Sequence, residues 1–580
     1  MYIESVPNRN SPPAILLRES WREGKTTRKK TIANLGSLSL DQIESMRLIL
    51  RGEKLVSPQK LFIIERSLPH GHVEAILGTI RNLGLDQIIS STPSRERDLV
   101  IGMIAERLIH GRSKLASVRL WQESTLAQEM GIEDASEDEL YSAMEWLLGR
   151  QRRIERKLAR RHLSEGDLVL YDLSSSYYEG EKCALVKYGY SRDGKKGLPI
   201  IVYGVMTDRA GRPLAIEVYP GNTSDSTTVV DQVEKVKDRF GLKKIVMVGD
   251  RGMLTAPQIE ILKEHPGIGW ITALRSSAIR DLIAAGNIPS LFDDRQLAQI
   301  VSSEYPGERL IACYNPFLAV KRKKTREQLL AATEKDLKKL EAEVQRRTKK
   351  QLKADQIGFK AGKIMGRYKM NKHFKLTIAD ANFLWERNAD AIAEETKLDG
   401  IYVVRTSEIE ESLSAEETVR SYKSLSHVER VFRGMKGPNI QVRPIHHRTD
   451  DHVKAHIFLC MLAYYLQWEM RRLLAPLIFD DEELECVRHT RNAVLPAQPS
   501  QSAQIKKNAK MTTDGFPLHS FDTLLEALKS RTRNTCRLSS SPADATFTLL
   551  TAPTKLQQKA LELLDLCPQP LHPSSVPSNP

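Results

Sequence analysis

Two aspartates each follow a short apolar run that is typical of a buried β-strand. Asp172 follows Leu-Val-Leu-Tyr, and Asp250 follows Ile-Val-Met-Val-Gly. Removing a carboxylate from water is costly unless a positive charge compensates it, and in proteins a metal ion often does so. For Asp172 alone, a simpler interpretation is an aspartate that caps the turn formed by Ser174 to Ser176. The second strand-end aspartate favours the metal interpretation.

The surrounding segments predict the fold that would bring these aspartates together. Apolar runs and turn residues indicate a strand, a hairpin of two strands, a helix, a strand, a helix and a strand. The expected strands are 167–176, 198–207, 213–219, 244–250 and 268–274, and the expected helices are 226–240 and the segment that Thr255 caps. This order is that of a ribonuclease-H-like α/β core, in which the first and fourth strands are neighbours. Asp172 and Asp250 would meet at one edge of the sheet, where two carboxylates repel each other unless a divalent cation lies between them. Hard oxygen ligands favour Mg²⁺ or Mn²⁺ over zinc.

A third carboxylate, Glu429, lies on a helix expected from about 415 to 435, after a strand at 401–405. Tyr422, Glu429 and Lys436 are seven residues apart in each step, which is about two helical turns, so the three would lie almost in line. The alternative is a surface helix on which Glu429 pairs with Arg433, a contact worth only about 0.2–0.5 kcal/mol.

One segment carries most of the positive charge. Residues 321–375 contain 19 Lys and Arg against 6 Asp and Glu, in a chain of 580 residues with a formal net charge of +14. Such a segment indicates a polyanionic partner, most simply nucleic acid, although a solvated charged helix is an equally plausible alternative. A helix with an apolar stripe is expected at 327–352 and would form a helical arm. Aromatic residues within the basic segment (Phe359, Tyr368 and Phe374) suit contact with unstacked bases, but core packing is their commoner role.

Cysteine usage and hydropathy indicate a reducing compartment. The six cysteines are scattered and include no Cys-x-x-Cys pair, which argues against zinc fingers and disulfide frameworks. No signal peptide is visible in the polar first 13 residues, and the best apolar run, 457–466, is too short to cross a bilayer. We expect a cytoplasmic protein.

These patterns predict the following organisation of the chain. The segments are 1–36, a basic segment with a possible strand pair; 37–165, a helical region expected to bind DNA; 166–275 and 396–472, two parts of the catalytic core; 276–395, an intervening segment with the basic arm; 473–567, a linker and a small helical region; and 568–580, a disordered tail.

With Asp172, Asp250 and Glu429 assembled, the sequence resembles the DDE transposases of bacterial insertion sequences. It is similar to the group whose third carboxylate lies in a Tyr-x2-Arg-x3-Glu-x6-Lys signature, which Tyr422, Glu429 and Lys436 match. The expected arginine is Leu425, and Arg433 could replace its contact. Further matches are Tyr171-Asp-Leu-Ser-Ser175, Gly221-Asn-Thr-Ser-Asp225, Gly249-Asp-Arg-Gly252 and Arg443-Pro-Ile-His-His-Arg448. The resemblance covers 165–275 and 396–470, and weakly the first 36 residues, and the family carries an insertion where 276–395 lies.

The resemblance implies a metal-dependent reaction on double-stranded DNA. Asp172, Asp250 and Glu429 would hold two Mg²⁺ or Mn²⁺ ions, which support hydrolysis at an element end and then joining of that end to target DNA. Tyr422, Arg433 and Lys436 would contact the flanking phosphates. The family also implies a homodimer that holds two DNA ends, with no membrane partner. Alternatives are a ribonuclease-H-like nuclease that does not join DNA, and a catalytically inactive DNA-binding relative.

Overall fold

The computed structural model describes residues 1–566, except 10, 54–61, 196, 289–291, 293–295, 485, 489 and 539–545. The disordered tail expected at 568–580 lies outside the described residues. The chain forms two units. One contains residues 1–68 and 531–552, and the other contains residues 69–530 and the segment that begins at Pro553.

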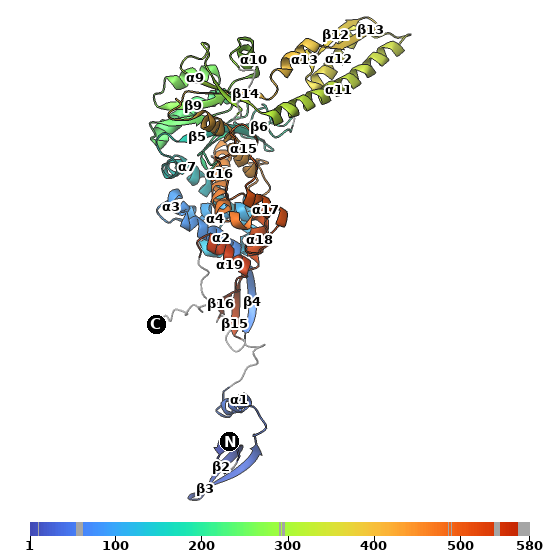
Figure 1. Ribbon diagram of the computed structural model, residues 1–580. Coiled ribbons are helices and arrows are strands. Elements are labelled where there is room, and N and C mark those ends of the chain that lie inside the picture. Colours follow the sequence, from blue (N-terminus) through green and yellow to red (C-terminus); the bar gives the residue numbers. More distant parts are fainter. Residues whose placement is uncertain are drawn as a thin grey trace. The chain divides into compact units, whose positions relative to one another are not determined.

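The smaller unit contains two three-stranded sheets and a helix. Strands β1 (Tyr2–Val6), β2 (Ala14–Glu23) and β3 (Thr26–Asn34) form a three-stranded sheet, so the basic first segment has three strands and not a pair. Helix α1 (Leu40–Leu50) follows and begins with a capping box at Ser39. The second sheet has the order β16–β15–β4 (Figure 1). Its strands are β4 (Phe62–Pro69), β15 (Thr532–Leu538) and β16 (Thr546–Leu550).

The larger unit begins with a helical region that was expected from the sequence. Its helices are α2 (Gly71–Asn82), α3 (Leu85–Ile89), α4 (Arg95–Ile109), α5 (Lys114–Leu120), α6 (Leu126–Met130) and α7 (Glu137–His162). Helix α4 is buried along most of its length, and both α4 and α7 pack against α16 (Asp450–Leu473) from the second half of the chain. This apolar contact joins the helical region to the sheet, because α16 also packs against β7.

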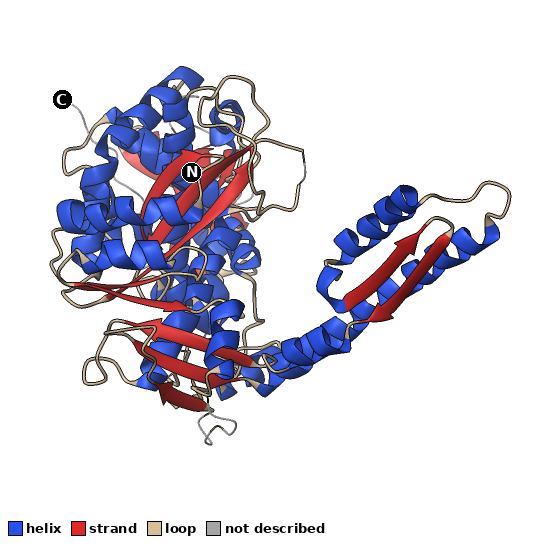
Figure 2. Ribbon diagram, turned by 90° about the horizontal axis from the view of Figure 1, so that it is seen from above, coloured by secondary structure: helices blue, strands red, loops and turns tan. Residues whose placement is uncertain are grey.

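The sheet of this unit has eight strands in the order β10–β11–β14–β9–β8–β5–β6–β7. Its first five strands along the chain are β5 (Leu168–Tyr177), β6 (Ile200–Thr207), β7 (Pro213–Pro220), β8 (Ile245–Val248) and β9 (Ile268–Ala273). Strands β5, β8 and β9 are parallel, whereas β6 and β7 are antiparallel to their neighbours. The order β7–β6–β5–β8–β9 is that predicted for a ribonuclease-H-like core, with the first and fourth strands adjacent. The fold is therefore mixed α/β with one large mixed sheet (Figure 2).

Helices connect and cover these strands. After β7 come a 3-10 turn (Asp225–Thr228), α8 (Val229–Glu234) and a wider turn of helix (Lys235–Phe240), and these together occupy the helix predicted at 226–240. Helix α9 (Ala256–Lys263) has a proline in its first turn and packs against β9. Further helices against the sheet are α10 (Ser276–Ala284), α14 (Ala415–Lys423) and α15 (Leu425–Met435).

Strands of the large sheet continue into the segment 276–395, for which the sequence predicted an insertion with a basic arm. Strands β10 (Leu297–Ile300) and β11 (Arg309–Tyr314) join β14 (Ile401–Thr406) and lengthen the sheet beyond β9. Strand β14 was predicted at 401–405, whereas β10 and β11 were not. The pattern of β10 is weak because the strand has only four residues and Gln299 is exposed. The segment 276–395 is thus partly continuous with the sheet.

An arm follows β11 and has its own hydrophobic core (Figure 2). It consists of α11 (Pro316–Arg346), α12 (Ala354–Tyr368), the hairpin β12 (Phe374–Ala379) and β13 (Asn382–Arg387), and α13 (Ala389–Thr396). The apolar stripe predicted on its long helix is buried at Leu330, Leu337, Leu340 and Val344. Of the three aromatics in the basic segment, Phe374 belongs to this core and Tyr368 bonds to Asp336 through its hydroxyl, whereas Phe359 is exposed.

The segment after Asn492, expected to be a linker, contributes to the core. Ala493 and Val494 are buried, and the Lys423 ammonium donates to the carbonyl oxygens of Ala493, Val494 and Leu495 at 2.9, 3.3 and 2.7 Å. These two apolar residues lie among Pro, Ser and Gln, which is why composition suggested a linker. Helices α17 (Gln501–Ala509), α18 (Phe521–Lys529) and α19 (Lys555–Leu563) follow, and α18 packs against α2.

Candidate active site

The two aspartates are in register on adjacent parallel strands. Leu168 of β5 pairs with Val246 of β8, and Leu170 pairs with Val248. The same register, continued by two residues, places Asp172 opposite Asp250. Neighbouring strands are about 4.7–4.9 Å apart, so the two residues are close even though Asp250 lies just beyond the end of β8. Asp250 is exposed, and Asp172 is partly buried.

Helix α15 brings Glu429 to the same face of β5. The Lys436 ammonium, at the end of α15, donates to Ser174 Oγ at 2.7 Å. Alternate residues of a strand point to the same face, so α15 covers the face that carries both Ser174 and Asp172. Glu429 is two turns before Lys436 on this helix and is exposed. The alternative interpretation, a surface helix on which Glu429 pairs with Arg433, is not supported, because both residues are described and they form no ion pair with each other.

The negative charges of Asp250 and Glu429 act on the carboxyl group of Asp172. The pKa of Asp172 is raised to about 7, chiefly by burial and to a smaller extent by these two charges. Two effects oppose this rise. They are a hydrogen bond from the Leu173 amide to Asp172 Oδ1 at 2.8 Å and the positive charge of Arg192. Without a cation, the site therefore holds its most buried carboxylate partly protonated at neutral pH.

The helix that carries the signature is interrupted between Tyr422 and Glu429. The sequence predicted one helix over 415–435, whereas α14 ends and α15 begins at Ser424. Ser424 is buried, and its hydroxyl donates to the carbonyl oxygen of Arg420 at 2.9 Å, which competes with the regular backbone pattern.

Tyr422 nevertheless lies at the site. Its pKa is raised to about 12, chiefly by burial and also by the charge of Asp250, a hydrogen bond to the Asp250 side chain and the charge of Glu429. Arg251 acts in the opposite direction on the same hydroxyl. Tyr422 thus connects α14 with the carboxylate that follows β8.

Lys436 is held inside the protein by a buried network. Its ammonium donates to Ser174 Oγ, to the carbonyl oxygen of Ser175 at 2.7 Å and to Asp193 Oδ1 at 2.9 Å. The Asp193 side chain is 1% exposed, and it also accepts from Arg443 at 2.6 Å and from the Tyr177 amide at 3.2 Å. Burial lowers the pKa of Lys436, and the Asp193 carboxylate opposes that decrease. The network connects β5, the loop after it and the end of α15.

Sequence reasoning missed Asp193 and Arg443 as members of this network, and Arg192 as the cation near Asp172. Asp193 lies in a Gly- and Lys-rich stretch that resembles an ordinary loop. Arg443 belongs to the Arg-Pro-Ile-His-His-Arg motif, which was the available signal. Arg433, in contrast, is exposed on α15 and makes no ion pair with any residue that the structure describes.

The three carboxylates do not form a ready-made set of metal ligands. Across the described parts of the chain, no group of three or more His, Cys, Asp or Glu side chains is close enough together to hold an ion as it stands. The donor set consists of carboxylate oxygens and fits Mg²⁺ or Mn²⁺.

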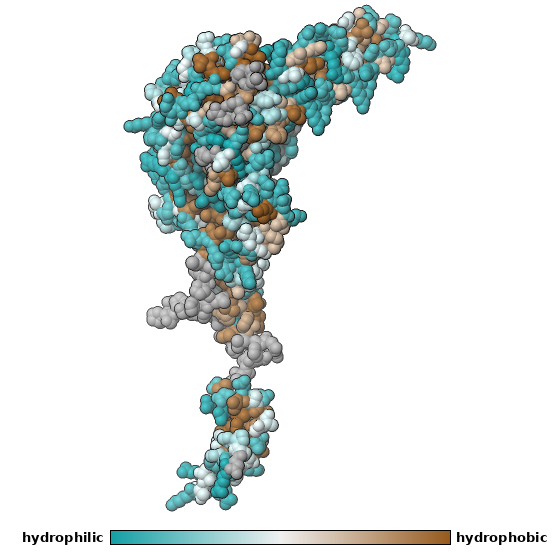
Figure 3. Space-filling model, viewed as in Figure 1, coloured by the Kyte–Doolittle hydropathy of each residue, from teal (hydrophilic) through white to brown (hydrophobic). Residues whose placement is uncertain are grey.

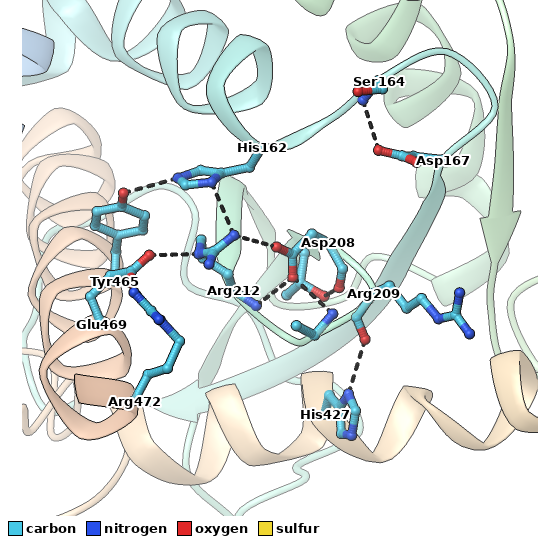
Figure 4. Close-up of polar contacts among 12 residues, drawn as sticks. His162, Ser164, Asp167, Asp208, Arg209, Arg212, His427, Tyr465, Glu469 and Arg472 are labelled. Carbon is cyan, nitrogen blue, oxygen red and sulfur yellow. Dashed lines mark hydrogen bonds and ion pairs between the residues drawn. The ribbon is translucent and has the colours of Figure 1, made fainter. Parts of the chain in front are cut away.

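A separate polar network occupies the opposite end of β5 (Figure 4). The Arg212 guanidinium donates to Asp208 at 2.8 Å and to His162 at 3.0 Å, and it pairs with Glu469 at 2.7 Å. Burial and the charge of Arg212 lower the pKa of His162 to about 3, so the imidazole is neutral. The network fastens the end of α7 and the β6–β7 turn to α16. An adjacent cavity of about 450 Å³ lies at the start of β5 and β8, away from the carboxylates.

Comparisons with known proteins agree with this geometry. Residues 169–466, just over half of the chain, match the family model described as Transposase DDE domain, and residues 3–60 match that of the IS1634 family transposase, N-terminal domain. No curated protein matches the chain. Among solved structures, one match is a piggyBac transposase synaptic complex with hairpin DNA, at 10% identity and a TM-score of 0.32. That match covers 76% of this chain and 88% of the other.

A TM-score this low is no basis for inferring a shared fold, so the assignment comes from the family models. The Asp172–Asp250 register and the coupling to Glu429 lie within the residues that the first model matches. No helix among the described residues is both long enough and apolar enough to span a bilayer. The chain belongs to the DDE transposase family and is a transposase of the bacterial insertion-sequence type.

Proposed function

We propose that Asp172, Asp250 and Glu429 are the catalytic carboxylates of this transposase, and that they act on double-stranded DNA at element ends and in the target. The observation that carries the proposal is geometric: the β5–β8 register places Asp172 opposite Asp250, and α15, which carries Glu429, lies on the same face of β5. Two Mg²⁺ or Mn²⁺ ions bound there would supply an activated oxygen nucleophile and stabilise the leaving 3′ oxygen.

Side chains of this protein control the protonation and the orientation of the carboxylates at the site and can contact the DNA. Asp172 is the least solvated carboxylate and must lose its proton before it can bind a cation, because its pKa is about 7. Tyr422 contacts Asp250 and restricts its orientation. Arg433 is exposed on the same helix as Glu429, where it can contact a DNA phosphate next to the scissile bond. Leu425 stands where the signature has arginine, so Arg433 takes a larger share of that contact.

We propose that the arm contacts DNA without reading its sequence. The arm is also the proposed insertion between Asp250 and Glu429. On α11, the residues at 321, 324, 328, 331, 335, 338, 342 and 346 fall on one side of the helix, since they are spaced three and four apart. We call them the α11 stripe. They are Lys321, Lys324, Gln328, Ala331, Lys335, Lys338, Ala342 and Arg346, and all are exposed.

The α11 stripe contains five cations and no acidic residue, and its cations make no ion pair with residues that the structure describes. It spans about 37 Å at 1.5 Å per residue, which is roughly one turn of DNA. Mostly hydrophilic side chains cover the face of the arm visible in Figure 3. A contact of this kind binds phosphates without reading bases. The proposed assembly is a homodimer on two DNA ends, acting in the cytoplasm.

Glu429→Gln tests the catalytic assignment. The change keeps the size of the side chain and removes the charge that would hold an ion, so the variant should fold, bind element-end DNA and cut none of it. Glu411→Gln, the same change at an exposed position before α14, should cut normally. Gel-shift assays in Ca²⁺ measure binding, and strand cleavage and end joining in Mg²⁺ measure activity. If Glu429→Gln still nicks the DNA in Mg²⁺, Glu429 is not the third carboxylate.

A further inference from the structure

Strands β2 and β3 extend well beyond the sheet to which they belong. Strand β1 pairs with β2 only from Ala14 to Arg18. Beyond that point, residues 19–23 of β2 and 26–30 of β3 pair with each other alone, and every residue from 19 to 32 is exposed. An isolated two-stranded ribbon gains little from packing, so core formation does not explain its length.

The end of the ribbon is a tight two-residue turn of Gly24 and Lys25. Gly24 has a φ of 66°, which belongs to the primed turns that fit the right-handed twist of a hairpin. The ribbon therefore keeps its regular pairing up to the tip, with Glu23 opposite Thr26.

The two faces of the ribbon differ in charge. Residues directly opposite each other in an antiparallel pair share a face, and here Arg18 is opposite Thr31, Ser20 opposite Lys29, and Arg22 opposite Thr27. We call these six residues the cationic face. It presents hydrogen-bond donors and has no acidic member. The opposite face contains two glutamates, together with Trp21, Arg28, Lys30 and Thr26.

The cations nearest the tip are available to a ligand. Arg18 and Lys29 pair with Glu4 at 2.9 and 3.2 Å, which partly neutralises the base of the cationic face. Arg22 and Lys25 make no ion pair with any residue that the structure describes. Positive charge is therefore concentrated at the tip of the ribbon, which projects beyond β1. Figure 3 shows mostly hydrophilic side chains at this end of β2 and β3.

We propose that the cationic face of this ribbon enters the DNA major groove at the element ends. A two-stranded ribbon fits the groove, which is about 12 Å wide. Arg22 can donate two hydrogen bonds to guanine O6 and N7, and Ser20 and Thr27 can bond to base edges beside it. Lys25 at the turn would contact a phosphate. This inference rests on the proposed function, because element ends are the substrate of that reaction.

The test uses the full-length chain and a duplex that carries the terminal sequence of the element. Arg22→Gln/Lys25→Gln should reduce affinity for this duplex by about tenfold or more, since it removes one base contact and one phosphate contact. Both residues are exposed, so folding should be unaffected. The matched control is Lys243→Gln/Lys244→Gln, two exposed lysines before β8, and it should bind as the unaltered chain does.

A second measurement separates the groove contact from charge alone. Replacing guanine by 7-deazaguanine in the duplex removes an acceptor that faces only the major groove. The unaltered chain should lose about tenfold in affinity for the substituted duplex, and the Arg22→Gln/Lys25→Gln variant should show no further loss. An equal loss in both proteins, or none in the unaltered chain, would overturn the inference.

Cleavage by the unaltered chain in Mg²⁺ reports on the proposed function separately. If the unaltered chain cuts element-end DNA and the ribbon variant binds as tightly as its control, the ribbon inference is wrong and the proposed function stands. If the unaltered chain neither prefers nor cuts element-end DNA, the proposed function fails first.

Discussion

Lys436→Met should destabilise the fold without weakening contact with DNA phosphates. The change keeps the apolar stem and removes an ammonium that donates to Ser174, Ser175 and Asp193. Breaking a buried ion pair typically costs 3–5 kcal/mol. Arg443 still neutralises Asp193 at 2.6 Å, so we expect a loss of about 3 kcal/mol in the free energy of unfolding.

A double-mutant cycle assigns this loss to the network. Asp193→Asn leaves both Lys436 and Arg443 without their anion and should cost about 4–5 kcal/mol. The double variant should be about 1–3 kcal/mol more stable than the sum of the two losses predicts, since the second change removes a charge that the first left unpaired. Urea unfolding followed by circular dichroism measures all four proteins.

The control is Lys454→Met on α16, whose side chain is 40% exposed and, among the described residues, pairs only with exposed Asp451 at 3.9 Å, so we expect a change within about 0.5 kcal/mol. Salt dependence of DNA binding distinguishes the alternative role. If Lys436 bound a phosphate, as the signature suggests, its loss would reduce the slope of log affinity against log salt by about 0.9. A variant with unchanged stability and a slope reduced by that amount would refute the network as the role of Lys436.

Two further predictions concern the site and the arm. The folded-state pKa of Asp172 is raised from 3.8 to about 7, so its contribution to stability is complete below pH 3.8 and is lost as the pH rises through 7. In metal-free buffer at pH 8, Asp172→Asn should therefore raise the free energy of unfolding by about 4 kcal/mol, and it should give no gain near pH 3. Asp238→Asn, at an exposed position, is the control. A loss of stability of Asp172→Asn at pH 8 would contradict the raised pKa. Changing the four lysines of the α11 stripe to Gln should weaken binding to all DNA sequences alike and reduce the salt slope by about 3–4, measured by fluorescence anisotropy. Four changes off the stripe (Lys323, Lys350, Lys363 and Lys369) are the control, and an unchanged slope would make the stripe a solvated surface.

Local patterns in the sequence predicted much of the core. The strand that contains Asp172, the hairpin after it and the strand before Asp250 have strong apolar runs and clear turn residues, so their positions follow from side-chain burial alone. The order of these elements predicted that β5 and β8 are neighbours, and their register now places the two aspartates opposite each other. The buried stripe on α11 followed from helical periodicity in the same way.

Four strands outside the predicted core were harder to predict. Strands β11 and β15 each pair with one strand that is remote in the chain, β14 and β4, and short β10 and β16 pair with β11 and β15. Pairing partners provide most of the stability of such strands, so a single sequence gives little sign of them. The burial of Ala493 and Val494 likewise involves a segment remote in the chain, because the Lys423 ammonium at the end of α14 donates to their carbonyl oxygens.

The roles of individual charged residues were decided by tertiary structure. The sequence determined that Tyr422, Glu429 and Lys436 occur at seven-residue spacing, and a straight helix would have presented all three to the same ligand. The packing of α14 against β9 and of α15 against β5 decides their partners: Tyr422 lies near Asp250, and Lys436 pairs with Asp193. Hydrogen bonds and Coulomb interactions depend on distances of a few ångströms, and such distances between segments remote in the chain exist only once the strands and helices have packed.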